Sequence, residues 1–372
     1  MREKPSFAVV GIALWVLLCV SAAPTRAEEI LPDPIPGRPS HEGSSLLRVE
    51  NATLLQANGW KRAFWVAFDE GGDGSPLGLL GQKNDGGKWE LREVPLTEQA
   101  GEPKIDDTEA LARKGDFIYL IGSNFGKKKG KLDAARQFVA RFREIDVRDT
   151  SPEIDLEVRR DDFELHRLLN DALAQWNVDL IDRGPKEEEE YIKKTRDSDE
   201  PGRDKVLKND RALNIEGATF LDSGQLALGL RYPVTKQGEP LVLVLDDVDA
   251  LFQKKLPKVA AVWILRGAGT PEQLRGIRAL DSAGGEIQAI VGSIERTSPE
   301  SPILKDHPGS DQVTSEHRAF TVPAMTAGAV DSRPVRGLAP AGNVEGVSVD
   351  GCSDWYLFDE AIRVRVLHEP HS

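Results

Sequence analysis

A short motif that recurs along the chain is the feature that most constrains its fold. The pattern [D/N]-x-E-[A/G] occurs at residues 107–110, 214–217 and 343–346, and a short apolar segment follows each copy. A fourth, degenerate copy at residues 274–277 has Arg275 at the Glu position. Widely spaced repeats that each hold two to four short strands are typical of the blades of a β-propeller.

A second repeat links the two ends of the chain. Trp65–Glu70 matches Trp355–Glu360 at the Trp, Phe, Asp and Glu positions. Propellers usually close their ring by joining the first blade to the last. We therefore expect the ring to close near these two segments.

Most of the remaining chain has the pattern of short β-strands bounded by Gly, Asp and Asn, which favours a sandwich, barrel or propeller. The repeat selects the last of these, so the predicted fold is an all-β propeller of five or six blades. The predicted strands are Leu46–Leu55, Ala63–Phe68, Phe117–Gly122, Phe138–Phe142, Leu226–Leu230, Leu241–Leu245, Ala260–Leu265, Ile287–Val291, Arg318–Val322, Trp355–Phe358 and Ile362–Leu367.

One segment departs from the strand pattern. Between Phe163 and Trp176 the apolar residues recur at helical spacing, which predicts a helix. Residues 183–210 follow with a dense mixture of charges that includes Glu187–Glu190. We interpret the region of about 150–212 as a helical, charged insertion exposed to solvent. The alternative is a charge-rich segment that covers a site.

The N-terminus has the three parts of a signal peptide. Arg2 and Lys4 precede the apolar run Phe7–Ala23, and small residues then lead to Ala27. We expect residues 1–27 to be a cleavable leader and the mature protein to be secreted or periplasmic, with no membrane span. Residues 28–45 are rich in proline and are expected to be a linker. Residues 46–368 then form a single propeller domain.

Charge and cysteine content limit the possible partners. The formal net charge is −13, so bulk attraction to nucleic acid or to anionic membranes is excluded. A small anionic ligand or an envelope protein remains as the expected partner. Cleavage of the leader would remove Cys19 and leave Cys352 as the single cysteine. Closure of the ring must then come from pairing of the chain ends rather than from a disulfide.

The carboxylates of the repeat, Glu109, Glu216 and Glu345, are the candidate catalytic residues. The innermost strands of a propeller crowd its central channel, so these side chains have two interpretations. They are either staples that bond backbone N–H groups of a neighbouring blade, or a ring of carboxylates at one channel mouth with Arg231 and Arg275 as counter-charges. Such a ring would suit Ca²⁺, which takes several oxygen ligands, or would supply a general acid or base.

A glycine-rich turn followed by lysines is the second candidate. Ser123 and Asn124 lie in this turn, and Lys129 and Arg136 follow it. Backbone N–H groups and positive charge of this kind could hold a phosphate or carboxylate, although a solvated basic hairpin loop has the same pattern. Asp69 and Asp359, which end the two Trp repeats, complete the candidate ligand-binding residues.

These residues also carry a family resemblance. The segments 214–218 and 226–233 resemble the bacterial domain-of-unknown-function family 3616, and residues 65–70, 107–123, 136–142 and 343–360 fit the same pattern in the same order. The resemblance spans about residues 45–365 and implies a β-propeller-like protein without an assigned activity. More distantly, the blades resemble esterase-like phytase propellers.

Two functions remain open. The first is an exported propeller of the periplasm or envelope that binds a ligand or protein without catalysis, and it predicts that the three glutamates are bonded to backbone. The second is a Ca²⁺-assisted hydrolase of phosphate or carboxylic esters, in which Arg231, Arg275 and the lysine loop receive the anion. It predicts that these groups meet at one mouth and that several are unsatisfied.

Overall fold

The computed structural model describes residues 26–38, 40–69, 74–97, 105–127, 130–149, 154–295, 300–324, 326–338, 343–360 and 362–371. The expectations for the leader and for Lys129 therefore lie outside the described residues, apart from the last two leader positions. Across the ranges given, no helix is long and apolar enough to cross a membrane.

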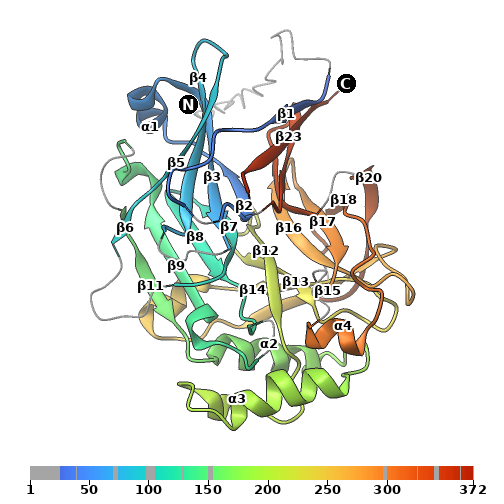
Figure 1. The fold of residues 1–372 in the computed structure, drawn as a ribbon. Helices are drawn as coiled ribbons and strands as arrows, with labels where there is room; N and C mark the ends of the chain where they lie inside the picture. The colour runs from blue at the N-terminus through green and yellow to red at the C-terminus, as the bar shows by residue number, and fades with distance from the viewer. Residues whose placement is uncertain are drawn as a thin grey trace, which may run out of the picture.

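Five sheets in the described chain form the blades (Figure 1). Blade 1 holds β2 (Gly43–Arg48), β3 (Trp60–Phe68), β4 (Leu77–Lys83) and β5 (Trp89–Glu93). Blade 2 holds β7 (Thr108–Lys114), β8 (Phe117–Gly122), β9 (Phe138–Arg143) and β11 (Glu157–Arg160). Blade 3 holds β12 (Asn214–Phe220), β13 (Leu226–Tyr232), β14 (Leu241–Leu245), β15 (Val259–Arg266) and β19 (Ala327–Asp331). Blade 4 holds β16 (Arg275–Ala283), β17 (Glu286–Ser293), β18 (Glu316–Thr321) and β20 (Arg333–Gly337). Blade 5 holds β21 (Val344–Val349), β22 (Ser353–Phe358), β23 (Arg365–Pro370) and β1 (Glu28–Ile30).

The remaining elements are short connections. They are α1 (Ala52–Asn58), β6 (Leu96–Thr97), η1 (Ala134–Arg136), η2 (Glu144–Asp146), β10 (Ile154–Asp155), α2 (Glu164–Gln175), η3 (Glu187–Lys193), α3 (Lys194–Arg196), η4 (Arg203–Lys205), η5 (Val248–Gln253) and α4 (Pro302–Asp306). Helix α1 corrects the strand predicted over Leu46–Leu55. The Asn51 side chain accepts a hydrogen bond from the Leu54 N–H, and Gly59 ends the helix in the left-handed region.

The innermost strands close a ring. Strand β2 contacts β7, which contacts β12, and the series continues through β16 and β21 back to β2. Apolar clusters fill the spaces between neighbouring blades, so each sheet buries both faces. The predicted all-β propeller is confirmed, and the number of blades is five.

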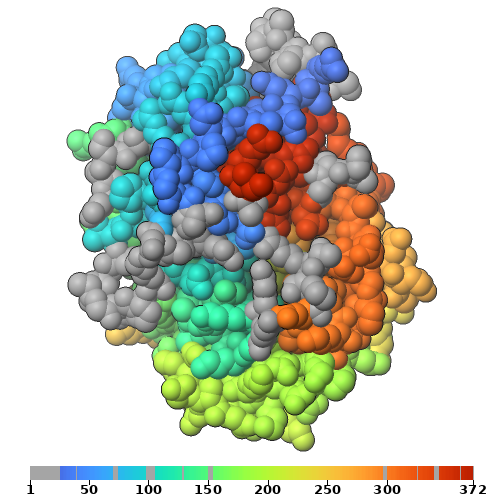
Figure 2. Space-filling model, in the orientation of Figure 1, coloured from blue at the N-terminus to red at the C-terminus, as the bar shows by residue number. Residues whose placement is uncertain are grey.

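The ring is closed by a segment that was expected to be a linker. Strand β1 pairs antiparallel with β23, with Glu28 opposite His368 and Ile30 opposite Val366. The N-terminal and C-terminal segments lie against each other in Figure 2. The two Trp repeats do not pair with each other. They occupy the second strands, β3 and β22, of adjacent blades, where the rings of Phe64 and Trp355 are 4.9 Å apart.

Pairing of the chain ends, as expected, therefore closes the ring, but with different residues. The expectation of a single cysteine after cleavage of the leader stays a prediction.

A bulge in every inner strand explains the sequence motif. The register of each inner strand shifts around one residue, and these residues are Ser44, Glu109, Glu216, Arg278 and Glu345. A bulge locally re-aims a side chain, so the motif marks the start of the inner strand. In blade 4 the equivalent residue is Arg278, which corrects the placement of Arg275 at the Glu position.

The small residue that follows the bulge allows neighbouring blades to approach closely. A Cβ on Gly217 would lie 2.8 Å from Ile277 Cγ2 and 2.9 Å from Leu280 Cγ, both on the inner strand of blade 4. A Cβ on Gly346 would lie 3.0 Å from the backbone nitrogen of Leu46 in blade 1. The glycine of the motif is therefore a packing requirement of the ring.

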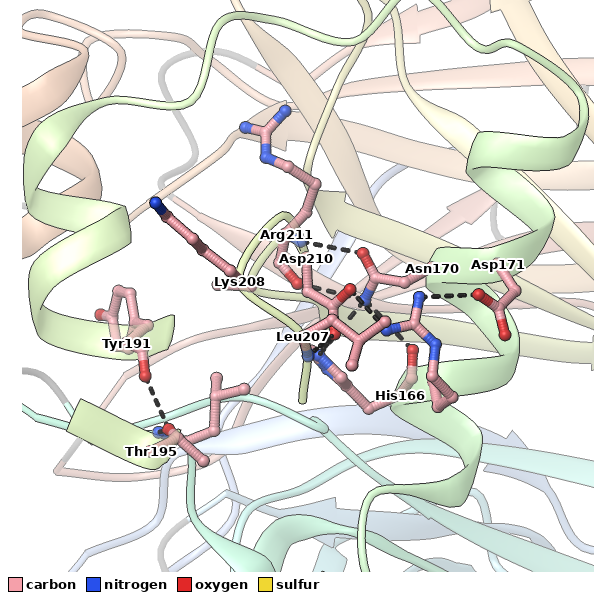
Figure 3. Close-up of polar contacts among 12 residues, drawn as sticks. His166, Asn170, Asp171, Tyr191, Thr195, Leu207, Lys208, Asp210 and Arg211 are labelled. Atoms are coloured by element: carbon pink, nitrogen blue, oxygen red, sulfur yellow. Dashed lines mark hydrogen bonds and ion pairs between the residues drawn. The ribbon is translucent and has the colours of Figure 1, made fainter. Parts of the chain in front are cut away.

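The insertion starts later than predicted and is not merely solvated. Strand β11 ends at Arg160, so the insertion begins after the outer strand of blade 2. Asp210, at its end, accepts hydrogen bonds from Arg167 and from the Leu207 N–H (Figure 3). The buried Glu187 accepts from Arg211, from Tyr232 Oη and from the Ala212 N–H.

A substitution in the motif tests the packing argument. Gly217→Ala should lower the free energy of unfolding by about 1–3 kcal/mol, because the added methyl group overpacks the contact between blades 3 and 4. Gly337→Ala is the control, since a Cβ there has no neighbour within 4 Å. Urea unfolding of both variants measures the difference, and equal stability of the two would contradict the argument.

Candidate functional site

A pocket lies at one mouth of the central channel. Its volume is about 240 Å³, and it is formed where inner strands begin and second strands end. Six predicted residues meet here: Asp69, Glu109, Arg136, Glu216, Arg231 and Glu345. Its other lining residues are Asp107, Phe125, Gly126, Lys127, Asn214 and Glu295.

Two of the three glutamates are neutralised by arginines. Arg278, which is 1% exposed, lies between Glu216 and Glu345, with its Nε 3.0 Å from Glu216 Oε2 and its Nη2 bonded to Glu345. Arg231 Nη1 donates to Glu216 Oε1 at 2.5 Å, and its Nε donates to the carbonyl of Ser293 at 3.1 Å. These carboxylates join blades 3, 4 and 5 through guanidinium groups. The expectation that they bond backbone N–H groups is wrong for both.

Glu109 is different from the other two. It is 8% exposed, and among the described residues its carboxylate has no hydrogen bond or ion pair. Burial and the negative charges of Glu216, Asp107 and Asp69 raise the pKa of Glu109 well above its ordinary value, and Arg231 opposes this only in part. Glu109 is therefore a buried carboxyl group that lacks a dedicated counter-charge.

Three carboxylates cluster around this position. Oxygen atoms of Asp69, Asp107 and Glu109 all lie within 4.8 Å of one another. Asp107 is paired with Arg136, whose Nη1 is 3.0 Å from Asp107 Oδ2. Burial raises the pKa of Asp107, while Arg136 acts in the opposite direction.

An asparagine also lines the pocket. Asn214 lines it, and the Nδ2 of Asn214 donates to Glu216 Oε1 at 3.2 Å. Its Oδ1 is buried without a hydrogen-bond partner in the structure. Three carboxylates and one amide oxygen are the kinds of ligand that Ca²⁺ takes in proteins.

The remaining predicted residues lie apart from the cavity. The N–H of Ser123 donates to the Asp107 carbonyl at 3.1 Å, and the N–H of Asn124 donates to the Arg136 carbonyl at 3.2 Å. Both residues are buried and fix the loop that carries Phe125. The N–H of Asp359 donates to the carbonyl of Asn343 at 3.0 Å.

The predicted basic residues differ in whether they line the pocket. Arg275 forms an ion pair with Glu316 on β18 and does not line the pocket. Arg136 lines the pocket, as predicted, but as the partner of Asp107. Lys129 lies outside the described residues.

The insertion contributes to the wall of the site. The ring of Tyr191, on the π-helix η3, lies 4.7 Å from the ring of Phe125, which lines the pocket. A Cβ on Gly126 would lie 2.8 Å from the Tyr191 ring, so Gly126 provides the space for this contact. The segment interpreted as solvated thus supports the channel mouth.

The sequence prediction missed Asp107, Asn214, Glu295 and Arg278. Asp107 and Asn214 occupy the first position of the motif, which was considered only as part of the pattern. Arg278 follows an apolar residue and precedes the small Ala279, as Glu216 and Glu345 follow an apolar residue and precede a glycine. That spacing was the available signal.

Comparisons with known proteins assign no function to the chain. No family model matches the chain, and no curated protein matches it. Among solved structures, a mannose phosphorylase from Leishmania mexicana in complex with phosphate is 10% identical, with 92% of this chain and 88% of that chain covered and a TM-score of 0.41. An α-L-arabinanase from Cellvibrio cellulosa complexed with arabinohexaose is 10% identical, with 88% and 91% covered and a TM-score of 0.40.

A third solved structure, an exo-β-1,3-galactanase from Phanerochaete chrysosporium with β-1,3-galactotriose, is 10% identical, with 92% and 64% covered and a TM-score of 0.43. Likeness at this level concerns the fold alone. The resemblance to family 3616 stays a prediction, and a functional argument must rest on the pocket.

The raised pKa of Glu109 predicts a specific pH dependence without divalent ions. At pH values well below the ordinary Glu pKa of about 4.3, Glu109 is protonated in both the folded and the unfolded state. It then has no effect on the free energy of unfolding. As the pH rises, the unfolded chain ionises first, and the native protein loses stability up to the folded-state pKa. Glu109→Gln removes this loss, so the variant should gain stability relative to wild type as the pH is raised from about 4 to 8.

Urea unfolding at several pH values in EDTA measures this difference. The exposed Glu272 supplies the matched control, and Glu272→Gln should follow wild type. A constant difference between Glu109→Gln and wild type at every pH would contradict the assignment.

Proposed function

We propose that this chain is a ligand-binding β-propeller whose channel-mouth pocket holds a divalent cation, with Ca²⁺ as the best fit. The proposal rests on the cluster of Asp69, Asp107 and Glu109. Burial and the neighbouring negative charges raise the pKa of Glu109 in this cluster. The pocket volume of about 240 Å³ lies below the usual range of small-molecule sites, about 300–1,000 Å³, so the ion is proposed as its primary occupant.

The distribution of charge supports a cation rather than an anion as the primary ligand. Arg136 is engaged by Asp107, while Arg231 and Arg278 are engaged by Glu216. These positive groups are therefore matched to acidic partners, and Glu109 is left without one among the described residues. A divalent cation would remove the mutual repulsion of the three carboxylates, and the oxygen of Asn214 would gain a partner.

The proposal includes export and family membership. The N-terminal pattern supports a leader that ends at Ala27, and the repeat supports a relation to family 3616. In this proposal the mature protein meets Ca²⁺ outside the cytoplasm and binds a small ligand or an envelope protein there. Secretion is tested by the N-terminal sequence of the exported protein, which should begin at Glu28.

Calcium binding is tested on protein treated with EDTA. Added Ca²⁺ should raise the stability of wild type by about 2.7 kcal/mol when its concentration is 100 times Kd. Glu109→Gln should weaken binding at least tenfold in isothermal titration calorimetry, whereas Glu272→Gln should leave it unchanged. The affinity should increase with pH, because Ca²⁺ must displace the proton of Glu109. Absence of any Ca²⁺ effect on wild type would reject the cation site.

A second function is favoured by the state of Glu109 itself. A buried carboxyl group whose pKa is raised well above its ordinary value is suited to act as a general acid on a leaving oxygen. Asp107 or Asp69, within 4.8 Å, could orient a bound water. In this candidate the protein is a hydrolase of phosphate or carboxylic esters, or of glycosides.

Hydrolysis is tested with nitrophenyl phosphates, carboxylic esters and glycosides, with Ca²⁺ and with EDTA. If Glu109 is the acid, Glu109→Gln should lower kcat/KM by about 10²-fold or more for substrates with poor leaving groups. The effect should be smaller for nitrophenyl leaving groups, which need little protonation. No turnover of the panel by wild type would leave the binding function as the conclusion.

A further inference from the structure

A second cavity lies away from the channel, in the wedge between blades 4 and 5. Its volume is about 510 Å³, compared with about 240 Å³ for the channel-mouth pocket. Strands β17, β18 and β20 form one wall, and strands β21 to β23 form the other. The structure describes every residue that lines this cavity. The cavity volume falls within the range of small-molecule sites, about 300–1,000 Å³.

The inner end of this cavity is polar and built from side chains that are almost fully buried. Gln288, His317 and Asp354 line it with exposures of 7%, 1% and 4%. His317 Nε2 is 3.0 Å from the Gln288 amide, and His317 Nδ1 is 2.9 Å from Tyr356 Oη. Tyr356 in turn donates to Asp354 at 3.1 Å.

The hydrogen bonds define the state of the histidine. Tyr356 has one hydroxyl proton and donates it to Asp354, so His317 Nδ1 must donate to Tyr356 Oη. The atom placed against His317 Nε2 is Gln288 Oε1, so an accepting Nε2 requires the Gln288 amide to be turned with its N–H₂ group toward the ring. Burial lowers the pKa of His317 to about 4, so the ring is neutral at pH 7. The network holds its members in fixed orientations.

The outer end of the cavity carries two guanidinium groups. Arg333 and Arg336 lie on β20, the outer strand of blade 4, and both act electrostatically on His317. Arg333 pairs with Glu286 at 2.6 Å, and Arg336 pairs with Glu369 at 2.8 Å. A guanidinium has five N–H donors, so each arginine retains donors for a second acceptor.

We propose that the wedge between blades 4 and 5 is a second binding site, for a small molecule that carries a carboxylate or phosphate group. Arg333 and Arg336 hold the oxyanion at the entrance, and the polar network around His317 receives the remainder of the molecule. This site is independent of the channel-mouth pocket, and it does not rest on the proposed cation.

The test uses the full chain with inorganic phosphate and succinate as probes in isothermal titration calorimetry. Wild type should bind at least one probe. The variant Arg333→Gln/Arg336→Gln should bind it at least tenfold more weakly, and Arg336→Gln alone should show part of that loss. The side chains of Arg333 and Arg336 are 58% and 40% exposed, so both variants should fold, which a thermal melt verifies.

A control variant locates the binding. Arg266→Gln removes an exposed arginine of blade 3 that pairs with Asp331, and it should bind the probes as wild type does. Binding of phosphate alone identifies a phosphorylated ligand, and binding of succinate alone identifies a carboxylate. The proposal is overturned if wild type binds neither probe, or if the double variant binds as tightly as wild type.

Discussion

The contact of Arg278 with Glu216 and Glu345 is the interaction on which the channel mouth depends. It joins the inner strands of blades 3, 4 and 5 at the level where the propeller is narrowest. Ions buried in this way are stable only as a matched set, because removing one partner from a buried ion pair costs about 3–5 kcal/mol. The ion pairs of Arg278 therefore hold three blades together and place two carboxylates beside the channel-mouth pocket.

The same arrangement explains why the opposite side of the mouth is acidic. The five bulges present Ser44, Glu109, Glu216, Arg278 and Glu345, so one arginine faces three glutamates. Arg231 and Arg136 supply further positive charge, but their bonds go to Glu216 and Asp107. Glu109 is left as the carboxylate without such a partner among the described residues. To join two blades as Glu216 and Glu345 do, Glu109 would need one more positively charged side chain beside it. Without that side chain, the position of Glu109 favours a bound cation or a retained proton.

Parts of this architecture could be predicted from sequence because they depend on local patterns. The apolar, β-rich runs Phe117–Gly122 and Leu241–Leu245 predicted strands β8 and β14 with the observed bounds. The motif gave the inner positions of Glu109, Glu216 and Glu345. In contrast, Ile30 joins the ring only because its strand finds β23 about 336 residues later, as its pairing with Val366 shows. Such long-range pairing leaves no local pattern in a segment of three residues.

The sequence by itself determined that the chain forms blades and that acidic residues begin several of them, since a strand pattern and a repeated motif are local properties. Only the tertiary structure decided which acids are matched by which bases. Arg278 was missed because an arginine stands where the motif has its glutamate, and only the bulge in the paired strands shows that the two positions are equivalent. Whether a carboxylate is a staple or part of a site depends on the charge that the next blade brings within a few ångströms, and closure of the ring alone fixes that distance.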